Sequence, residues 1–413
     1  MECLKGACVI GQSGGPTSVF NASALGVIET ALKNEYITKV LAAENGLSGI
    51  LEDRLFDCGL EDPAELSKLK TTPGSALGSC RHRLPEWTEN EDNYLKILKT
   101  FKKHNIRYFF YNGGNDSMDT CEKVSRYLAA KNYPCRVIGV PKTIDNDLCG
   151  TDHCPGFGSA AKYIAACTAE LSREAYTYES GTVLILEIMG RNAGWLTAAS
   201  SLASVIGEGP DLVYLPEVPF SPERFLHDIA EKLKTQKSVI CAVAEGVKTE
   251  DGKYVTDGGV LHGATDVFGH TQMGGLAAQL AAYVKNSLHI KTRGIEFSLL
   301  QRCAAHCASL TDIEEAYLAG KTAVEAAVSG VTGKMVGFAR KRDAEGYVCD
   351  TVLSDLSLAA NAENTVPPEW INESHNGLNE QFINYALPLI QGDPKPFGEN
   401  GLPSYPKLKK IRA

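Results

Sequence analysis

The sequence has no long apolar segment. Its longest apolar stretches, residues 182–188 and 239–244, are of strand length, whereas a helix that crosses a bilayer needs about 20 apolar residues. The first residues also lack the charged segment, the longer apolar segment and the small-residue cleavage site of a secretory signal peptide. We therefore expect no membrane partner and a cytoplasmic protein.

An excess of basic residues is missing as well. The net charge is −9 at pH 7, whereas binding of a nucleic-acid backbone depends on a concentrated basic surface. We therefore expect no nucleic-acid partner. Small anionic substrates remain compatible with this charge, because local arginines and helix N-termini suffice to hold them.

The cysteines do not indicate a disulfide framework. There are thirteen of them, an odd number, and in a chain without an export signal we expect reduced thiols. Two clusters combine metal-ligating residue types: Cys149 with His153 and Cys154, and Cys303 with His306 and Cys307. Neither cluster has a second Cys/His pair at the spacing of a zinc site, so we expect no metal at either.

The chain does contain apolar, β-branched runs that alternate with helical patterns. The runs predict strands at residues 7–10, 40–43, 108–111, 137–140, 182–188, 212–215 and 239–244. The helical patterns lie at residues 19–34, 93–104, 118–130, 159–173, 192–205, 222–235, 276–287 and 312–329. Strands that are apolar at nearly every position are buried on both faces, as in a parallel sheet covered by helices.

With 413 residues, the chain is too long for one ordinary core, and two domains are expected. We predict an α/β protein of two doubly wound, Rossmann-like domains with the active site in the cleft between them. The first domain is placed at residues 1–141 with about 304–335, and the second at 142–303. A C-terminal extension, 336–413, is expected to pack on the domains.

The first expected strand ends in a glycine-rich loop. Gly14 and Gly15 permit a ligand to approach the backbone closely, and the loop leads into a helix, whose N-terminus attracts anions. For this loop alone, a plain tight turn is an equally good explanation.

A second glycine-rich loop precedes the helix predicted at 118–130. Gly114 and Ser117 would cradle an anion, whereas the carboxylate of Asp116 would repel an anion placed too close. This loop combines an anion cradle with a carboxylate, and Asn115 directly precedes that carboxylate. The combination is best explained by binding of Mg²⁺ or by discrimination between phosphates.

The loop at residues 141–147 adds a lysine, a hydroxyl and two further acids. A carboxylate such as Asp145 or Asp147 suits the general base of a phosphoryl transfer, with Lys142 and Thr143 at hand for phosphate oxygens. Taken alone, an acid-rich loop is more often an Asx-turn and a helix cap.

Guanidinium groups that fork onto phosphate oxygens are available near the strand ends, from Arg81, Arg191, Arg293 and Arg302. Two nucleotide-binding patterns are set aside. The G-x-G-x-x-A pattern at 156–161 follows a polar, irregular segment instead of a strand, and we interpret it as a helix start that lends its N-terminus to the site. The Gly-Lys-Thr at 320–322 lacks the earlier glycine of a Walker A loop.

With these motifs assembled, the chain resembles the phosphofructokinase superfamily, and most closely its pyrophosphate-dependent branch. The resemblance covers about residues 11–302, and its motifs occur in the order of the family. They are Gly14-Gly15, 113–117, 141–147, 189–191, Pro216-Glu217, Glu245 and Gln301-Arg302.

The resemblance implies a role for each matching residue. Asp145 would be the general base on the sugar 1-hydroxyl, with Thr143 and Asp147 beside it. The sugar phosphate would be held by Met189, Gly190, Arg191, Glu245 and Arg302, with Arg293 reaching in from a neighbouring subunit. The donor would be held by Gly14, Gly15, Gly114, Ser117 and Arg81.

Two positions indicate the donor. Relatives that use ATP have glycine at the positions of Lys142 and Asp116, whereas pyrophosphate-dependent relatives have lysine at the former. Lys142 would neutralise the leaving phosphate, and Asp116 would repel the α-phosphate of a nucleotide. Both are expected to take part in catalysis with pyrophosphate.

The chain also departs from the family pattern. Asn115 stands where many relatives have a metal-binding aspartate, so Asp116 is expected to share the Mg²⁺ site with it. Thr182 and Leu299 replace residues that often line the sugar-phosphate site. Leu25 and Glu29 stand where allosteric bacterial relatives have effector-binding arginines, and no such control is expected.

The resemblance implies Mg²⁺-dependent, reversible phosphoryl transfer from pyrophosphate to fructose 6-phosphate by a homodimer or homotetramer. An ATP-dependent phosphofructokinase is the first alternative, and a catalytically silent sugar-phosphate-binding paralogue is the second. Asp145, Asp147 and Arg191 disfavour the silent paralogue, because a binding module needs no base. A dehydrogenase has only the misplaced glycine pattern in its favour.

Overall fold

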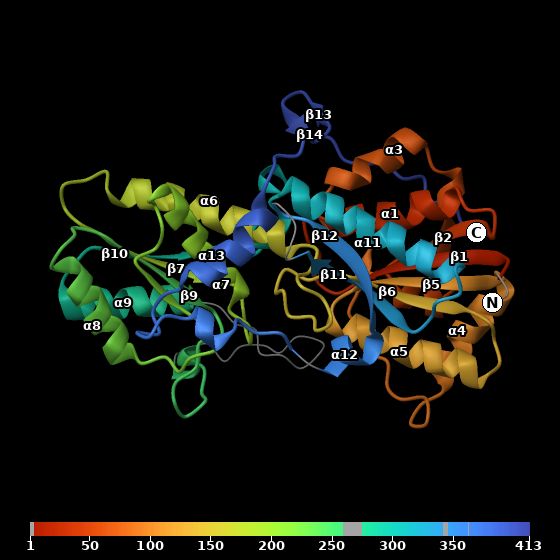
Figure 1. The fold of residues 1–413 in the computed structure, drawn as a ribbon, viewed down its shortest axis with the longest axis horizontal. Coiled ribbons are helices and arrows are strands. Elements are labelled where there is room, and N and C mark those ends of the chain that lie inside the picture. The colour runs from red at the N-terminus through yellow and green to blue at the C-terminus, as the bar shows by residue number, and fades with distance from the viewer. Residues whose placement is uncertain (1–3, 259–274, 342–345, 362) are drawn as a thin grey trace.

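The computed structural model describes residues 4–258, 275–341, 346–361 and 363–413. Two α/β domains lie side by side along the long axis of the molecule (Figure 1), and each is built on its own sheet. The predicted fold class is therefore confirmed.

The sheet of the first domain has eight strands. Seven of them follow the order β12-β11-β6-β5-β1-β2-β3, and β4 pairs with β1 in addition. The strands are β1 (Gly6–Ser13), β2 (Ile37–Ala43), β3 (Leu55–Asp57), β4 (Ser79–Cys80), β5 (Ile106–Gly113), β6 (Arg136–Pro141), β11 (Lys334–Arg340) and β12 (Cys349–Asp355). Pairing is parallel except at the two edges, where β3 and β12 run antiparallel to their neighbours.

The sheet of the second domain has four parallel strands in the order β10-β7-β9-β8. They are β7 (Val183–Ile188), β8 (Leu212–Tyr214), β9 (Val239–Ala244) and β10 (Thr292–Glu296). Every residue of β7 and of β9 is buried, as expected of central parallel strands covered on both faces. A short hairpin, β13 (Gly398–Glu399) with β14 (Leu402–Pro403), lies in the C-terminal segment.

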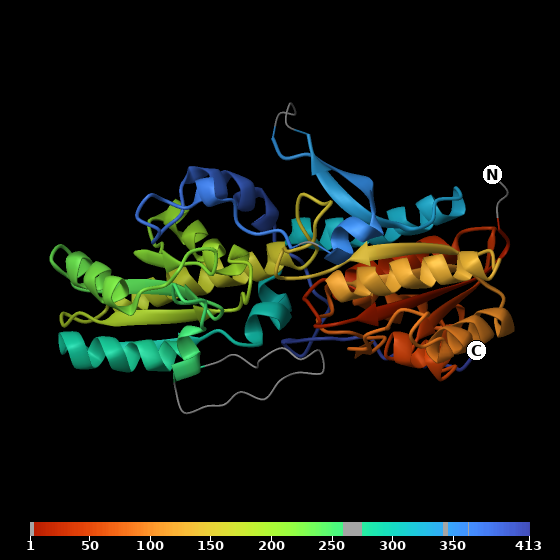
Figure 2. The same cartoon turned by 90° about the horizontal axis from the view of Figure 1, so that it is seen from below.

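Helices cover the faces of both sheets (Figure 2). They are α1 (Phe20–Leu32), α2 (Leu47–Leu51), α3 (Pro63–Ser67), α4 (Asp92–Lys103), α5 (Asn115–Ala130), α6 (Phe157–Ala175), α7 (Trp195–Ala199), α8 (Pro222–Leu233), α9 (Leu276–Leu288), α10 (Leu300–Cys303), α11 (Leu310–Val328), α12 (Leu356–Asn361) and α13 (Glu380–Ala386). In α4, for example, Tyr94, Ile97, Leu98 and Phe101 share one helical face and are buried. No helix among the described residues is long and apolar enough to cross a membrane.

The predicted strands and helices are present, with one difference in kind. The segment predicted as one helix at 192–205 is the short α7 followed by a 3₁₀ helix, Ser200–Ile206, which ends at Gly207 in the left-handed region (φ 78°). Three serines lie in this segment, and serine competes with the helical backbone for hydrogen bonds, which favours the tighter and shorter turns seen here.

Two glycines bring α1 and α11 into close contact on one face of the first sheet. A Cβ atom on Gly26 would lie 2.1 Å from the carbonyl oxygen of Tyr317, and one on Gly320 would lie 2.1 Å from that of Ser23. Gly320 therefore serves helix packing, in agreement with setting aside the Walker-like pattern at 320–322.

The C-terminal part of the chain contacts both domains. Strands β11 and β12 belong to the first sheet, so that sheet includes part of the segment 336–413 that we assigned to the extension. Helix α13 lies on the second domain (Figure 1), where Phe382 and Ala386 enter its core. The last residues return to the first domain, because the Asp57 N–H donates to the Ile411 carbonyl oxygen at 3.0 Å.

Candidate active site

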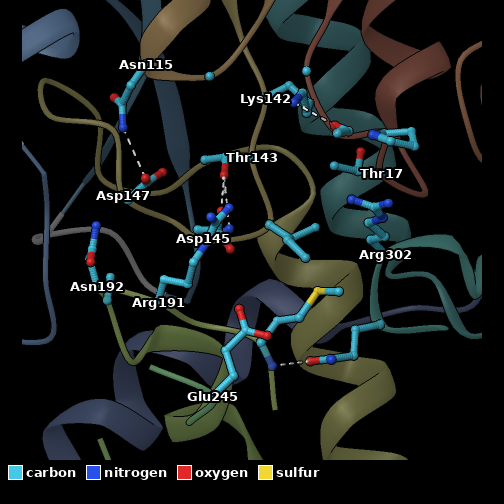
Figure 3. Close-up of a pocket in the computed structure, with 18 of the residues that line it drawn as sticks. Thr17, Asn115, Lys142, Thr143, Asp145, Asp147, Arg191, Asn192, Glu245 and Arg302 are labelled. Atoms are coloured by element: carbon cyan, nitrogen blue, oxygen red, sulfur yellow. Dashed lines mark hydrogen bonds between the residues drawn. The ribbon is translucent and has the colours of Figure 1, made fainter. Parts of the chain in front are cut away.

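A cavity of about 1030 Å³ lies between the two domains. The carboxyl ends of β1, β5, β6, β7 and β9 lead into it, which is where ligands bind in open α/β sheets. Figure 3 shows side chains from both domains pointing into this space. The predicted site residues that line it are Gly14, Gly15, Arg81, Gly114, Asn115, Asp116, Ser117, Lys142, Thr143, Asp145, Asp147, Met189, Arg191, Glu245 and Arg302.

Two predicted residues do not line the cavity. Gly190 adopts a φ of 143°, and its backbone N–H donates to Glu245 Oε1 at 3.4 Å, so it orients a cavity residue from behind. Arg293 lies exposed on β10, an edge strand of the second sheet. Its expected contribution to a neighbouring subunit stays a prediction.

Gly15 lies at a point where three positively charged groups converge. Its carbonyl oxygen accepts a hydrogen bond from Lys142 Nζ at 2.7 Å. A Cβ atom at Gly15 would lie 2.9 Å from Arg302 Nη1 and 3.8 Å from Arg81 Nη2. This end of the cavity therefore combines an accessible backbone with two guanidiniums and one ammonium, a set suited to a polyphosphate.

Arg302 lies beside the donor loop, with its guanidinium next to Gly15. The role that the resemblance implies for it, at the sugar phosphate, stays a prediction. Its neighbour Gln301 is buried and accepts a hydrogen bond from the Met189 N–H at 3.1 Å. The Gln301-Arg302 pair thus contacts both ends of the cavity.

Lys142 is buried, although it carries an ionisable group. Its ammonium lies 5.0 Å from the centre of the Phe20 ring, and its side chain is only 4% exposed. Burial lowers the pKa of Lys142 to about 8, with Arg81 acting in the same direction and Asp145 opposing it. The charge of Lys142 is therefore expected to change around pH 8.

The second glycine loop begins α5. A Cβ atom on Gly113 would lie 2.0 Å from Ser117 Oγ, so the turn requires glycine there. Asp116 lies in the first turn of α5, is exposed and faces the cavity. Its carboxylate therefore stands at the helix N-terminus that would otherwise attract an anion.

Asn115 and Asp147 form a pair across two loops (Figure 3). The Asn115 side-chain amide donates to Asp147 Oδ2 at 3.0 Å. The remaining oxygens, Asn115 Oδ1 and Asp147 Oδ1, are both buried without a hydrogen-bond partner in the described part of the chain. An unpartnered amide oxygen and an unpartnered carboxylate oxygen are ligand types that Mg²⁺ prefers.

Asp145 is oriented by Thr143. The Asp145 N–H donates to Thr143 Oγ1 at 3.0 Å, and the Thr143 hydroxyl donates to Asp145 Oδ2 at 3.4 Å. Burial raises the pKa of Asp145, against the opposing effects of Lys142 and Arg191. Burial and the neighbouring charge of Asp145 also raise the pKa of Asp147. A carboxylate with a raised pKa is a stronger base when it is ionised.

Glu245 completes the part of the site formed by the second domain. Its backbone N–H donates to the Ile188 carbonyl oxygen at 2.9 Å, which places the residue beside the 189–191 loop, and its carboxylate accepts from the Gly190 N–H. Burial raises the pKa of Glu245 to about 7, helped by the charge of Asp145 and opposed by Gly190 and Arg191. Glu245 and Arg191 thus offer an acceptor and a cationic donor for a polyhydroxy phosphate.

Comparison with known proteins identifies the family. The phosphofructokinase model matches residues 7–327, which is more than half of the chain. The chain belongs to the phosphofructokinase family. A pyrophosphate–fructose 6-phosphate 1-phosphotransferase of Halomonas elongata is 43% identical over 97% of this chain and 96% of its own length. The corresponding enzyme of Xanthomonas campestris is also 43% identical, over 98% and 97%.

A solved structure has the same architecture. The pyrophosphate-dependent phosphofructokinase of Nitrosospira multiformis superposes with a TM-score of 0.90 and is 40% identical, covering 99% of this chain and 98% of its own. These relatives confirm the predicted resemblance to the pyrophosphate-dependent branch of the phosphofructokinases.

Some residues of this phosphofructokinase site were not predicted. Thr17, Asn192, Tyr254 and Glu363 also line the cavity. Asn192 directly follows the predicted Arg191, and Thr17 belongs to the first glycine loop. Both could therefore have been predicted from their sequence neighbours. Glu363 comes from the C-terminal extension and accepts a hydrogen bond from Asn192 Nδ2 at 3.0 Å. No motif marks Glu363 in the sequence.

One expectation about a helix N-terminus was wrong. We interpreted the segment at 156–161 as a helix start that lends its N-terminus to the site. In the structure, the Gly156 and Ser159 N–H groups both donate to the buried Asp312 carboxylate, each at 2.9 Å. The α6 N-terminus therefore binds an internal anion from α11 and is occupied.

Proposed function

We propose that this chain transfers a phosphoryl group from pyrophosphate to the 1-hydroxyl of fructose 6-phosphate, giving fructose 1,6-bisphosphate and phosphate. The observation that carries the proposal is the buried ammonium of Lys142, which contacts the donor loop at Gly15. The names of the relatives from Halomonas and Xanthomonas support the same donor and acceptor.

The residues divide the reaction between them. Asp145 takes the proton of the 1-hydroxyl as its oxygen forms a bond to the transferred phosphorus, and the bridging P–O bond of pyrophosphate breaks. The leaving phosphate gains negative charge, which Lys142 offsets together with Arg81 and Arg302. Because pyrophosphate and the product bisphosphate lie close in energy, the reaction is reversible.

The donor set at Asn115 and Asp147 fits Mg²⁺. Their two unpartnered oxygens are the kind of ligand that Mg²⁺ prefers, and Asp116 on the same helix turn adds a charge nearby. When bound, Mg²⁺ supplies positive charge to the pyrophosphate oxygens. The Asn115 amide holds Asp147 in place with its other end.

The sugar phosphate is assigned to the second domain. Arg191, Glu245 and Met189 line the cavity there. We include the expected homodimer or homotetramer in the proposal, because the exposed Arg293 would reach a sugar phosphate only in another subunit. The proposal also includes a cytoplasmic location.

ATP is the alternative donor. Asp116 argues against it, since a carboxylate at the α5 N-terminus repels the additional phosphate of a nucleotide. A silent paralogue is disfavoured because Asp145 retains the hydrogen bonds and the raised pKa of a base.

The deciding experiment compares donors. Purified protein is given fructose 6-phosphate and Mg²⁺ with either pyrophosphate or ATP, and fructose 1,6-bisphosphate is measured with a coupled assay. We expect turnover with pyrophosphate. Turnover with ATP alone would overturn the donor assignment, and binding of fructose 6-phosphate without turnover from either donor would indicate the silent paralogue.

A further inference from the structure

A segment of the C-terminal extension, residues 363–366, lies against the loop that carries the general base. The Asn364 N–H donates to the Asp147 carbonyl oxygen at 2.8 Å, and Glu363 forms an antiparallel bridge with Leu148. These contacts fix the backbone on the C-terminal side of Asp145.

The same segment holds the loop that carries Arg191. Trp195 Nε1 donates to the Asn364 carbonyl oxygen at 2.9 Å. One oxygen of Glu217 accepts both the Gly194 N–H at 2.8 Å and the Val366 N–H at 3.0 Å. Residues 363–366 therefore connect the general-base loop with the start of α7, directly after the sugar loop.

A second contact comes from Tyr385 on α13. Its hydroxyl accepts a hydrogen bond from Asn146 Nδ2 at 2.8 Å and donates to the Asp152 carbonyl oxygen at 2.8 Å. The other end of the Asn146 amide accepts from the Cys154 N–H at 2.8 Å. Tyr385 therefore contacts the residue that separates Asp145 from Asp147.

Asn146 requires such support. It adopts a φ of 57°, in the left-handed region that residues other than glycine enter at a cost. Its side chain is buried and is held at both ends by hydrogen bonds. The two acids flanking it keep their directions only while this turn is maintained.

We infer that Tyr385 is a positioning residue for catalysis: together with the backbone of residues 363–366, it fixes the general-base loop relative to the sugar-phosphate loop. The inference rests on the proposed function, because it concerns the geometry of the same reaction. It gives the extension a role in the turnover rate, beyond its packing on the two domains.

The test removes one hydroxyl. In Tyr385→Phe the ring keeps its packing against Trp195, whose ring centre is 5.2 Å away, but the bond to Asn146 is lost. We expect kcat to fall about three- to tenfold, in line with the loss of one or two hydrogen bonds. The KM values for both substrates should stay within about twofold, because Tyr385 is not among the residues that line the cavity.

Tyr133→Phe is the matched control. The Tyr133 hydroxyl also makes two hydrogen bonds, to the carbonyl oxygens of Phe101 and Ile106, each at 2.8 Å. Ile106 begins β5 at the end of the sheet opposite to the cavity. We expect Tyr133→Phe to lose comparable thermal stability with kcat unchanged. An equal fall of kcat in both variants would reduce Tyr385 to a structural role and overturn the inference.

A double variant tests the route through Asn146. Glycine adopts a φ of 57° without strain, so Asn146→Gly removes the side-chain link without forcing the turn. In that background, Tyr385→Phe should change kcat by less than about twofold, because the bond it removes no longer exists. If the fold-decrease of kcat in the double variant equals the product of the decreases in the two single variants, Tyr385 does not act through Asn146 and the inference is wrong.

Hydrogen exchange gives a readout that needs no turnover. We expect faster amide exchange over residues 142–156 in Tyr385→Phe, but not in Tyr133→Phe, at a temperature where both are folded. Unchanged exchange in that region would overturn the inference. Rates are measured with pyrophosphate and with ATP. If the unaltered enzyme is inactive with both, the proposed function is refuted, and the exchange result alone then decides whether Tyr385 fixes the 142–156 segment.

Discussion

Lys142 Nζ donates a hydrogen bond to the carbonyl oxygen of Gly15 at 2.7 Å and so joins two loops that extend from the first sheet. The loops follow β6 and β1, which are separated in the sheet by β5. A long side chain such as that of lysine is needed to reach from the loop after β6, across β5, to the loop after β1. The contact places a positive charge at the backbone that we assign to the donor.

The donor preference should depend on two residues. In Lys142→Gly we expect kcat/KM for pyrophosphate to fall about 10²- to 10³-fold, because a charge that stabilises the leaving phosphate is lost. Measurable turnover with ATP is expected only when Asp116→Gly is added. Lys142→Met keeps a long, uncharged side chain at this buried position and so separates loss of charge from loss of packing. Full pyrophosphate activity in Lys142→Gly would contradict the assigned role.

The activity should fall at high pH. Burial lowers the pKa of Lys142 to about 8, so its ammonium is present below that pH and is lost above it. The pH profile of kcat/KM for pyrophosphate, which reports the free enzyme, should therefore decline above about pH 8. In Lys142→Arg, which stays charged, the decline should move to higher pH at a lower overall rate. Ionisation of pyrophosphate is common to both enzymes, so coinciding profiles would exclude Lys142 as the cause.

Asp145 should affect turnover and not sugar binding. For Asp145→Ser we expect kcat to fall about 10²- to 10⁴-fold, the usual contribution of a general base. The dissociation constant of fructose 6-phosphate, measured by calorimetry, should change only a few-fold, because Arg191 and Glu245 remain. An unchanged kcat would refute Asp145 as the base.

The Mg²⁺ requirement should depend on Asn115. We expect Asn115→Ala to raise the Mg²⁺ concentration for half-maximal rate about tenfold or more, because one ligand and the support of Asp147 are lost together. Asn192→Ala is the control, since Asn192 also lines the cavity but bonds to Glu363. Equal Mg²⁺ dependence in Asn115→Ala and the unaltered enzyme would argue against this metal site.

The α1–α11 contact should tolerate no side chain at Gly26. A Cβ atom there would lie 2.1 Å from the Tyr317 carbonyl oxygen, so Gly26→Ala should lower the free energy of unfolding by about 1–3 kcal/mol through overpacking. Thr30→Ala, on a partly exposed position of the same helix, should stay within about 0.5 kcal/mol. Denaturant unfolding measures both, and equal stability of the two variants would contradict the close packing.

Most of the site could be predicted because its residues lie in loops at the ends of parallel strands. Apolar runs such as those of β7 and β9 identify the strands, and the carboxyl ends of parallel strands meet at one edge of a sheet. That rule brings Gly15, Gly114 and Asp145 together without knowledge of any contact. The family motifs then add a role for each residue.

Contacts between distant, irregular segments could not be predicted in this way. The Asp312 carboxylate at the α6 N-terminus, the Arg302 guanidinium beside Gly15 and the arrival of Glu363 in the cavity each join residues without a shared pattern. Side-chain reach and direction decide them, and neither has a periodicity that a sequence displays.

The sequence by itself determined the two-domain α/β fold and the loops of the site, and it led to the prediction that Lys142 and Asp116 select the donor. These follow from the burial pattern of strands and from the chemistry of residues at strand ends. Only the tertiary structure decided that Asn115 pairs with Asp147 and that Tyr385 supports Asn146. Such contacts depend on how the chain closes on itself over long separations, and local preferences do not contain that information.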